Sequence, residues 1–163
     1  MFKTKEIVNI ALISAIAFLL SLVILFRMPN GGSITVYLVP LFFAAFNNDL
    51  KTNVFIAIVT ATLQVLFGGY VLNPIQVMLD YYLPVMFICI CMIFRLNKYI
   101  NLFIGSLLAM VCYVISGMIF FEVPFLASII YNATFFIPTI ILNLIIFALI
   151  NPRLGKIYES YQK

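Results

Sequence analysis

Apolar runs about as long as a bilayer is thick follow one another along almost the whole chain, and this pattern excludes a soluble fold. Of the 163 residues, 66% are hydrophobic and only 9% are charged. One stretch, IQVMLDYYLPVMFICICMIF from Ile75 to Phe94, is long enough to cross a bilayer as a helix. Soluble domains of this size are not built this way. The sequence therefore predicts an all-α integral membrane protein, with residues 1–163 forming a single transmembrane domain.

Six apolar segments can be drawn between the polar and charged stretches. They are residues 7–26, 34–46, 54–67, 75–94, 100–121 and 125–150. The second and third are short for full crossings, but the charged loop Asn47–Lys51 separates them and requires an even number of passages. Pro40 lies within the second segment, where a kink is tolerable if neighbouring groups satisfy the freed carbonyl. We therefore expect a bundle of six transmembrane helices.

The positive charges give the bundle an orientation. The termini and loops on one side carry eight of the nine basic residues: Lys3, Lys5, Lys51, Arg95, Lys98, Arg153, Lys156 and Lys163. The other side carries only Arg27. Lysine and arginine accumulate in cytoplasmic loops, so both termini are predicted to be cytoplasmic, with the loops around residues 29–33, 68–73 and 122–124 outside. The net charge of +4 follows from this topology and does not indicate nucleic-acid binding.

Several kinds of chemistry are disfavoured by the residues present. Cys89, Cys91 and Cys112 lie inside apolar runs and are typical of small buried hydrophobic residues rather than of disulfides or metal ligands. The chain has no histidine and its acids are scattered singly, so neither a metal site nor a cofactor is expected. There is no GxxxxGK[ST] loop for ATP hydrolysis. A small membrane enzyme would need an acid–base pair or a nucleophile within the membrane. Only Asp80 is available there, so this class of protein is disfavoured.

Asp80 is the acid that stands inside an apolar segment with no basic residue near it in sequence. A carboxylate near the middle of a transmembrane helix costs roughly 2.5–3.5 kcal/mol on insertion scales, so such residues usually mark functional sites. The alternative is a side chain that reaches the headgroups or hydrogen-bonds a neighbouring helix. Asp80 is therefore the first candidate for a binding residue.

Other polar groups are predicted at the same depth. Asp80, Tyr113 and Asn132 lie about five to eight residues from the outer ends of their segments, or within roughly 8–12 Å of the outer edge at the helical rise. Further candidates at similar depth are Ser116, Tyr81, Tyr131 and Gly31, the last within the loop MPNGGS. No comparable cluster is expected in the inner half. The sequence thus predicts a single pocket that opens outward.

The predicted pocket suits a small aromatic ligand that is cationic or bears an amide. Asp80 would be its counter-ion or hydrogen-bond acceptor, and the rings of Phe121 and Tyr81 could stack on it or contact a cation. Each tyrosine taken alone is more typical of the interfacial aromatic belt. Separately, Ala11 and Ala15 lie one turn apart in the first segment and would allow another helix to approach closely, or would serve internal packing.

Four strings in order, MPNGGSITVYLVPLFFAAF, LNPIQVMLDYYL, YVISGMIFF and IIYNATFFIP, span nearly the whole chain. Together they resemble the thiamine-specific S components (ThiT family) of energy-coupling factor transporters. The resemblance implies a six-helix substrate-capture subunit of the bacterial plasma membrane, without catalytic activity, that docks on a transmembrane coupling protein and two ATPases. It also implies that Ala11 and Ala15 form the docking motif, that Asp80 holds the aminopyrimidine of thiamine, and that Tyr81 and Asn132 are pocket residues.

The chain departs from the family at several pocket positions. Tyr113 stands where the family usually has histidine, Ala127 replaces a tyrosine, and Phe121 and Gly31 stand at tryptophan positions. Tyr113 retains a hydrogen-bonding group, and Tyr131 could supply the missing hydroxyl. Two ligand classes therefore stay open: thiamine or a close relative, and another heterocyclic vitamin or nucleobase-like compound.

Overall fold

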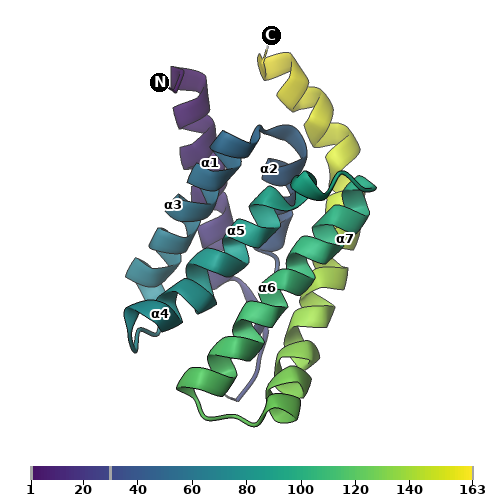
Figure 1. The fold of residues 1–163 in the computed structure, drawn as a ribbon. Helices are drawn as coiled ribbons and strands as arrows, with labels where there is room; N and C mark the ends of the chain where they lie inside the picture. The colour runs from purple at the N-terminus through teal and green to yellow at the C-terminus, as the bar shows by residue number, and fades with distance from the viewer. Residues whose placement is uncertain (1, 30, 163) are drawn as a thin grey trace.

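The computed structural model describes residues 2–29 and 31–162, so the predictions for Asn30 and Lys163 fall outside the described residues. The chain folds into a helical bundle with one small hairpin (Figure 1). The helices are α1 (Thr4–Leu22), α2 (Leu38–Asn47), α3 (Leu50–Gly68), α4 (Pro74–Val77), α5 (Leu83–Ile90), α6 (Lys98–Phe120) and α7 (Phe125–Gln162). Between α4 and α5 lies a π-helical turn, Met78–Tyr82, and a 3-10 turn, Cys91–Phe94, follows α5.

Within the described residues, five helical segments are long and apolar enough to span a membrane, counting Pro74–Phe94 as one. The remaining predicted crossing is α2, which has only 10 residues. This is about 15 Å at the helical rise, or half the thickness of a bilayer core. Its first eight residues are almost all buried, so α2 is an internal helix surrounded by the longer ones. The predicted all-α membrane fold is confirmed, with one crossing reduced to a half-length helix.

The two termini lie at the same end of the bundle (Figure 1). The α2–α3 and α5–α6 connections share that end, while the hairpin and the α3–α4 and α6–α7 connections lie at the opposite end. This grouping of loops is the one that the distribution of basic residues predicts. We call the end with the termini cytoplasmic and the other end outer, following that distribution.

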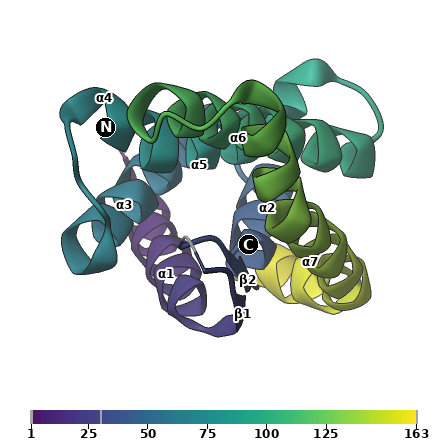
Figure 2. The same cartoon turned by 90° about the horizontal axis from the view of Figure 1, so that it is seen from below.

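The first two predicted segments have different bounds from those expected. α1 ends at Leu22 rather than Phe26, and Ile24–Arg27 forms strand β1, which pairs antiparallel with β2 (Ser33–Thr35). Short apolar runs cannot be assigned to helix or strand by periodicity alone. Here the two runs are strands because they pair with each other. The turn between the strands includes Gly31, whose φ of 100° favours glycine. Viewed from the outer end, the hairpin lies between α1 and α7 (Figure 2).

Pro40 does not kink α2, because it lies in the first turn of the helix, where no intrahelical N–H bond is lost. The start of α2 is held in place by Asn143 of α7. The Asn143 amide accepts from the Val39 N–H at 3.1 Å and donates to the Thr35 carbonyl at 2.8 Å. Asn143 is fully buried. One side chain therefore fixes the junction of the hairpin, α2 and α7.

The last helix is longer than predicted. α7 continues from Phe125 to Gln162 instead of ending at Ile150, and it contains Pro138 and Pro152. The carbonyl groups that these prolines leave free do not end the helix. Its final turns extend past the apolar segment and bring Tyr158 against α1 and the α2–α3 turn.

Candidate functional site

Asp80 lies in the π-helical turn that interrupts the fourth crossing, about 9 Å from the start of α4 at the helical rise. Single π-turns of this kind occur often at functional sites. The Gln76 amide donates a hydrogen bond to the Asp80 carboxylate, and its oxygen accepts from the Leu72 N–H at 3.0 Å. Gln76 is almost fully buried. The carboxylate is thus oriented by a buried amide one turn earlier on the same helix.

Ser116 of α6 faces the same carboxylate. It interacts electrostatically with Asp80, although its geometry falls short of a regular hydrogen bond and its buried oxygen has no other partner among the described residues. Only 1% of Ser116 is exposed. A buried hydroxyl without a partner is costly. The Ser116 hydroxyl and the Asp80 carboxylate therefore lie between α6 and the π-turn, where they can form further hydrogen bonds.

Tyr113, one turn before Ser116 on α6, contacts two other elements. Its hydroxyl lies 3.3 Å from the hydroxyl of Tyr37, the N-cap residue that precedes α2. Its ring packs edge-on against Phe136 of α7, with 5.1 Å between centroids. Asp80 is close enough to interact electrostatically with the Tyr113 hydroxyl. The described contacts of Tyr113 are thus with Tyr37 and Phe136, and its predicted place in the pocket with Asp80 stays a prediction.

An aromatic wall continues along α7 toward the hairpin. Phe136 contacts Phe135 at 6.2 Å, and Phe135 contacts Tyr131 at 5.7 Å between ring centroids. The Tyr131 hydroxyl accepts from the Gly32 N–H at 3.0 Å. A side chain at Gly32 would lie 2.5 Å from the Phe135 ring. The hairpin turn therefore packs directly on the wall, while exposed Gly31 serves the shape of the turn.

Asn132 is buried between α6 and α7, next to Gly117. Its amide donates to the Ser128 carbonyl at 2.9 Å, one turn earlier on its own helix. Its side-chain oxygen accepts no hydrogen bond from any described residue. That oxygen is consequently available as an acceptor.

Two of the predicted residues lie at the outer rim. The Tyr81 hydroxyl accepts from the Tyr70 N–H at 2.7 Å, and Phe121 lies 6.2 Å from the Tyr70 ring. Tyr81 also interacts electrostatically with Asp80, which precedes it. Phe121 is about half exposed, and no contact with Asp80 or the aromatic wall brings it into the cluster. Its predicted stacking role stays a prediction.

Gln76 and Tyr37 are site residues that the sequence reasoning missed. The sequence could have indicated Gln76, because this polar residue stands four positions before Asp80 and therefore lies on the same face of the helix. No sequence pattern indicates Tyr37, since its role depends on where α2 begins and on its contact with Tyr113, 76 positions away.

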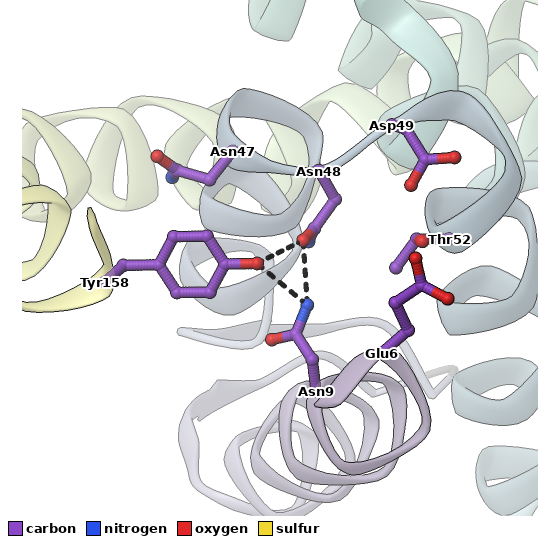
Figure 3. A pocket seen from close by; sticks show the side chains of 7 residues that line it. All are labelled: Glu6, Asn9, Asn47, Asn48, Asp49, Thr52 and Tyr158. Carbon is purple, nitrogen blue, oxygen red and sulfur yellow. Dashed lines mark hydrogen bonds between the residues drawn. The ribbon is translucent and has the colours of Figure 1, made fainter. Parts of the chain in front are cut away.

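A second polar cluster lies at the cytoplasmic end, which corrects the expectation that the inner half has none (Figure 3). The Asn48 side-chain oxygen accepts from Asn9 at 2.7 Å and from the Tyr158 hydroxyl at 2.6 Å. These residues adjoin a hollow of about 230 Å³ that Glu6, Asn47, Asp49 and Thr52 also line. The cluster ties α1, the α2–α3 turn and α7 together.

Ala11 and Ala15 both lie exposed on α1. The opposite face of the helix is buried and includes Ile13, Ser14 and Ala17. The two alanines are thus not buried against any of the described residues. Their exposure is compatible with the predicted docking role, which no contact in the structure tests.

The chain matches the model of a family described as "Thiamine transporter protein (Thia_YuaJ)" over residues 7–159. The thiamine transporter ThiT of Bacillus subtilis (strain 168) is 29% identical over an alignment 180 positions long, which covers 93% of this chain and 94% of that protein.

Two solved structures share the fold. ThiT from Listeria monocytogenes superposes with a TM-score of 0.74 at 19% identity, over 93% of this chain and 95% of that one. The S component of a bacterial ECF transporter superposes with a TM-score of 0.66 at 21% identity, over 94% of this chain and 97% of that one. At these identities the two superpositions show the fold alone.

Proposed function

Because the chain belongs to the thiamine transporter protein family, whose model matches residues 7–159, we propose that it is the substrate-capture subunit (S component) of an energy-coupling factor importer and that it binds thiamine from outside. The observation that carries this proposal is the pairing of the Asp80 carboxylate in the π-turn with the buried Ser116 hydroxyl of α6, the helix that also carries Tyr113 of the aromatic wall. A bacterial plasma membrane location follows from the apolar helices and the family.

The chemistry of thiamine fits this set of side chains. Thiamine consists of an aminopyrimidine ring and a thiazolium ring with a fixed positive charge. The Asp80 carboxylate accepts hydrogen bonds from the aminopyrimidine, and Gln76 holds the carboxylate in place for this contact. Aromatic rings such as that of Tyr113 suit the thiazolium cation, and the free oxygen of Asn132 is a further acceptor.

The protein acts as a transport subunit without an ATPase of its own. A binder without an energy source cannot accumulate its ligand, so import requires ATP hydrolysis by partner subunits. We assign the coupling-protein contact to the exposed pair Ala11 and Ala15 on α1, where small side chains permit close helix approach.

The proposal is tested by isothermal titration of the purified wild-type protein in detergent with thiamine, alongside Asp80→Asn. Replacing the carboxylate should weaken thiamine binding by at least about tenfold, the scale of one charged contact. Glu122→Gln is the matched control: Glu122 is an exposed acid in the outer α6–α7 turn, and its replacement should leave affinity unchanged. A folded, monodisperse wild-type protein that does not bind thiamine would refute the substrate assignment.

A second ligand class is favoured by one observation. Tyr113 stands where family members usually carry histidine, and its hydroxyl already contacts Tyr37. A different donor pattern selects a different heterocycle. A competition panel of thiamine against its pyrimidine and thiazole halves, other heterocyclic vitamins and nucleobases distinguishes the two: displacement of bound thiamine by a nucleobase at similar concentration would support the second class.

A further inference from the structure

We propose that Tyr37 is a positioning residue that fixes the Tyr113 hydroxyl as a hydrogen-bond donor toward the ligand, so that the ligand must present an acceptor at this point. This inference rests on the proposed function, since it takes the cluster around Asp80 as the binding site.

The backbone at Tyr37 is held from outside its own helix. Helix starts need partners for their free N–H groups, and the side chain of Tyr37, the N-cap residue, makes no capping bond in the described structure. Asn143 accepts from the Val39 N–H instead, and its amide nitrogen donates to the Thr35 and Thr139 carbonyls, each at 2.8 Å. The residues on both sides of Tyr37 are thus anchored to α7, and the direction of its side chain is set.

The hydroxyl of Tyr37 has one described partner. Tyr37 is 8% exposed, and among the described residues its hydroxyl hydrogen-bonds only the Tyr113 hydroxyl, at 3.3 Å. A buried O–H that donates to nothing is costly. The Tyr37 proton is therefore best satisfied when it points to the Tyr113 oxygen.

This requirement determines what Tyr113 offers to the site. Its ring is held by the edge-on contact with Phe136, so only the hydroxyl proton is left to rotate. A phenol carries one proton and accepts through the same oxygen. When that oxygen accepts from Tyr37, the Tyr113 proton is available to an acceptor on the ligand. Without Tyr37, Tyr113 could turn either a donor or an acceptor to the site.

The test is a double-mutant cycle on thiamine affinity, measured by titration calorimetry of the full chain in detergent. Tyr37→Phe should weaken binding about three- to tenfold, the range for one neutral hydrogen bond. In the Tyr113→Phe background the same change should have less than about a twofold effect, because the group through which Tyr37 acts is then missing. A residue with only a structural role would weaken binding equally in both backgrounds.

Tyr82→Phe is the matched control. It also removes a tyrosine hydroxyl from a hydrogen bond, in this case with Thr62 at 3.0 Å on the α3 side of the bundle, and it should leave thiamine affinity unchanged. If Tyr37→Phe does not yield monodisperse protein, Tyr37→Met removes the hydroxyl with a flexible side chain and enters the same cycle.

The outcomes separate this inference from the proposed function. Wild-type protein that binds thiamine, with a Tyr37→Phe effect that is absent or equal in both backgrounds, overturns the role of Tyr37 and leaves the function standing. Folded wild-type protein that binds no thiamine overturns both. A loss of affinity that disappears in the Tyr113→Phe background supports the inference.

Discussion

At the residue scale, the site depends on buried polar side chains that hold other polar side chains. Asp80 takes its orientation from Gln76, and Gln76 is itself fixed by the Leu72 N–H. Burying such groups is favourable only when each finds its partner. The Gln76–Asp80 pair therefore behaves as a unit, in which the amide prepares the carboxylate before the ligand arrives.

Replacing the amide should accordingly weaken ligand binding although Gln76 is not proposed to touch the ligand. Gln76→Leu removes a hydrogen bond to a charged group, which is typically worth about 1.5–3 kcal/mol, and the Kd for thiamine should rise about tenfold or more. Titration calorimetry measures this. Gln64→Leu on α3 is the control, since the Gln64 side chain is partly buried and hydrogen-bonds no described residue. Equal affinities in Gln76→Leu and wild type would contradict a preparatory role.

At the element scale, the apolar pattern predicted the long helices but not the local breaks that shape the site. Segments such as α6 are continuous hydrophobic stretches of bilayer length, and their type is set by the need to satisfy backbone groups in lipid. The hairpin of β1 and β2 and the half-length α2 depend on contacts distant in sequence, among them Asn143 with Val39. No local periodicity encodes such pairing, nor the π-turn that carries Asp80.

The same limit applies to the candidate site. That Asp80, Ser116 and Tyr113 would avoid the lipid could be predicted, because a polar residue inside an apolar segment must face something other than lipid, while their roles in binding stay predictions. Phe121 was selected for its aromatic ring and its place at a family tryptophan position, and the structure places it beside Tyr70. Depth along a helix can be counted from sequence, but the direction of a side chain around the helix requires the packing.

The exposed face of α1 gives the element-scale prediction. Ala15→Trp should abolish thiamine uptake in cells that express the coupling subunit and the ATPases, because a large ring blocks close helix approach. Binding of thiamine to the purified variant should persist. The control is Ile145→Trp, a similar enlargement at an exposed position of α7, which should retain uptake. Loss of binding in purified Ala15→Trp would show that α1 serves the site rather than a partner.

At the scale of the whole molecule, two polar clusters occupy opposite ends of one apolar bundle. Each cluster leaves polar atoms without a described hydrogen-bond partner: the Ser116 and Asn132 side-chain oxygens in the outer cluster, and the Asn48 amide nitrogen in the cytoplasmic cluster. In the cytoplasmic cluster, the Asn9 amide nitrogen donates to Asn48 and to the Tyr158 hydroxyl, joining helices from both termini (Figure 3). We infer a division of roles, in which the outer end binds and the inner end holds the helices together.

This division predicts that stability and affinity respond separately to substitution. Tyr158→Phe removes the 2.6 Å bond to Asn48 and the 3.1 Å bond from Asn9. The midpoint of heat-induced loss of monodisperse protein should fall, since each bond contributes about 1 kcal/mol. Thiamine affinity should stay within about twofold of wild type, because distant sites contribute independently. Tyr99→Phe is the control, as its ring packs between Phe46 and Phe147 while its hydroxyl bonds no described residue. A parallel fall in thiamine affinity in Tyr158→Phe would mean that the two ends are coupled, and the inner cluster would then belong to the transport cycle rather than to the scaffold.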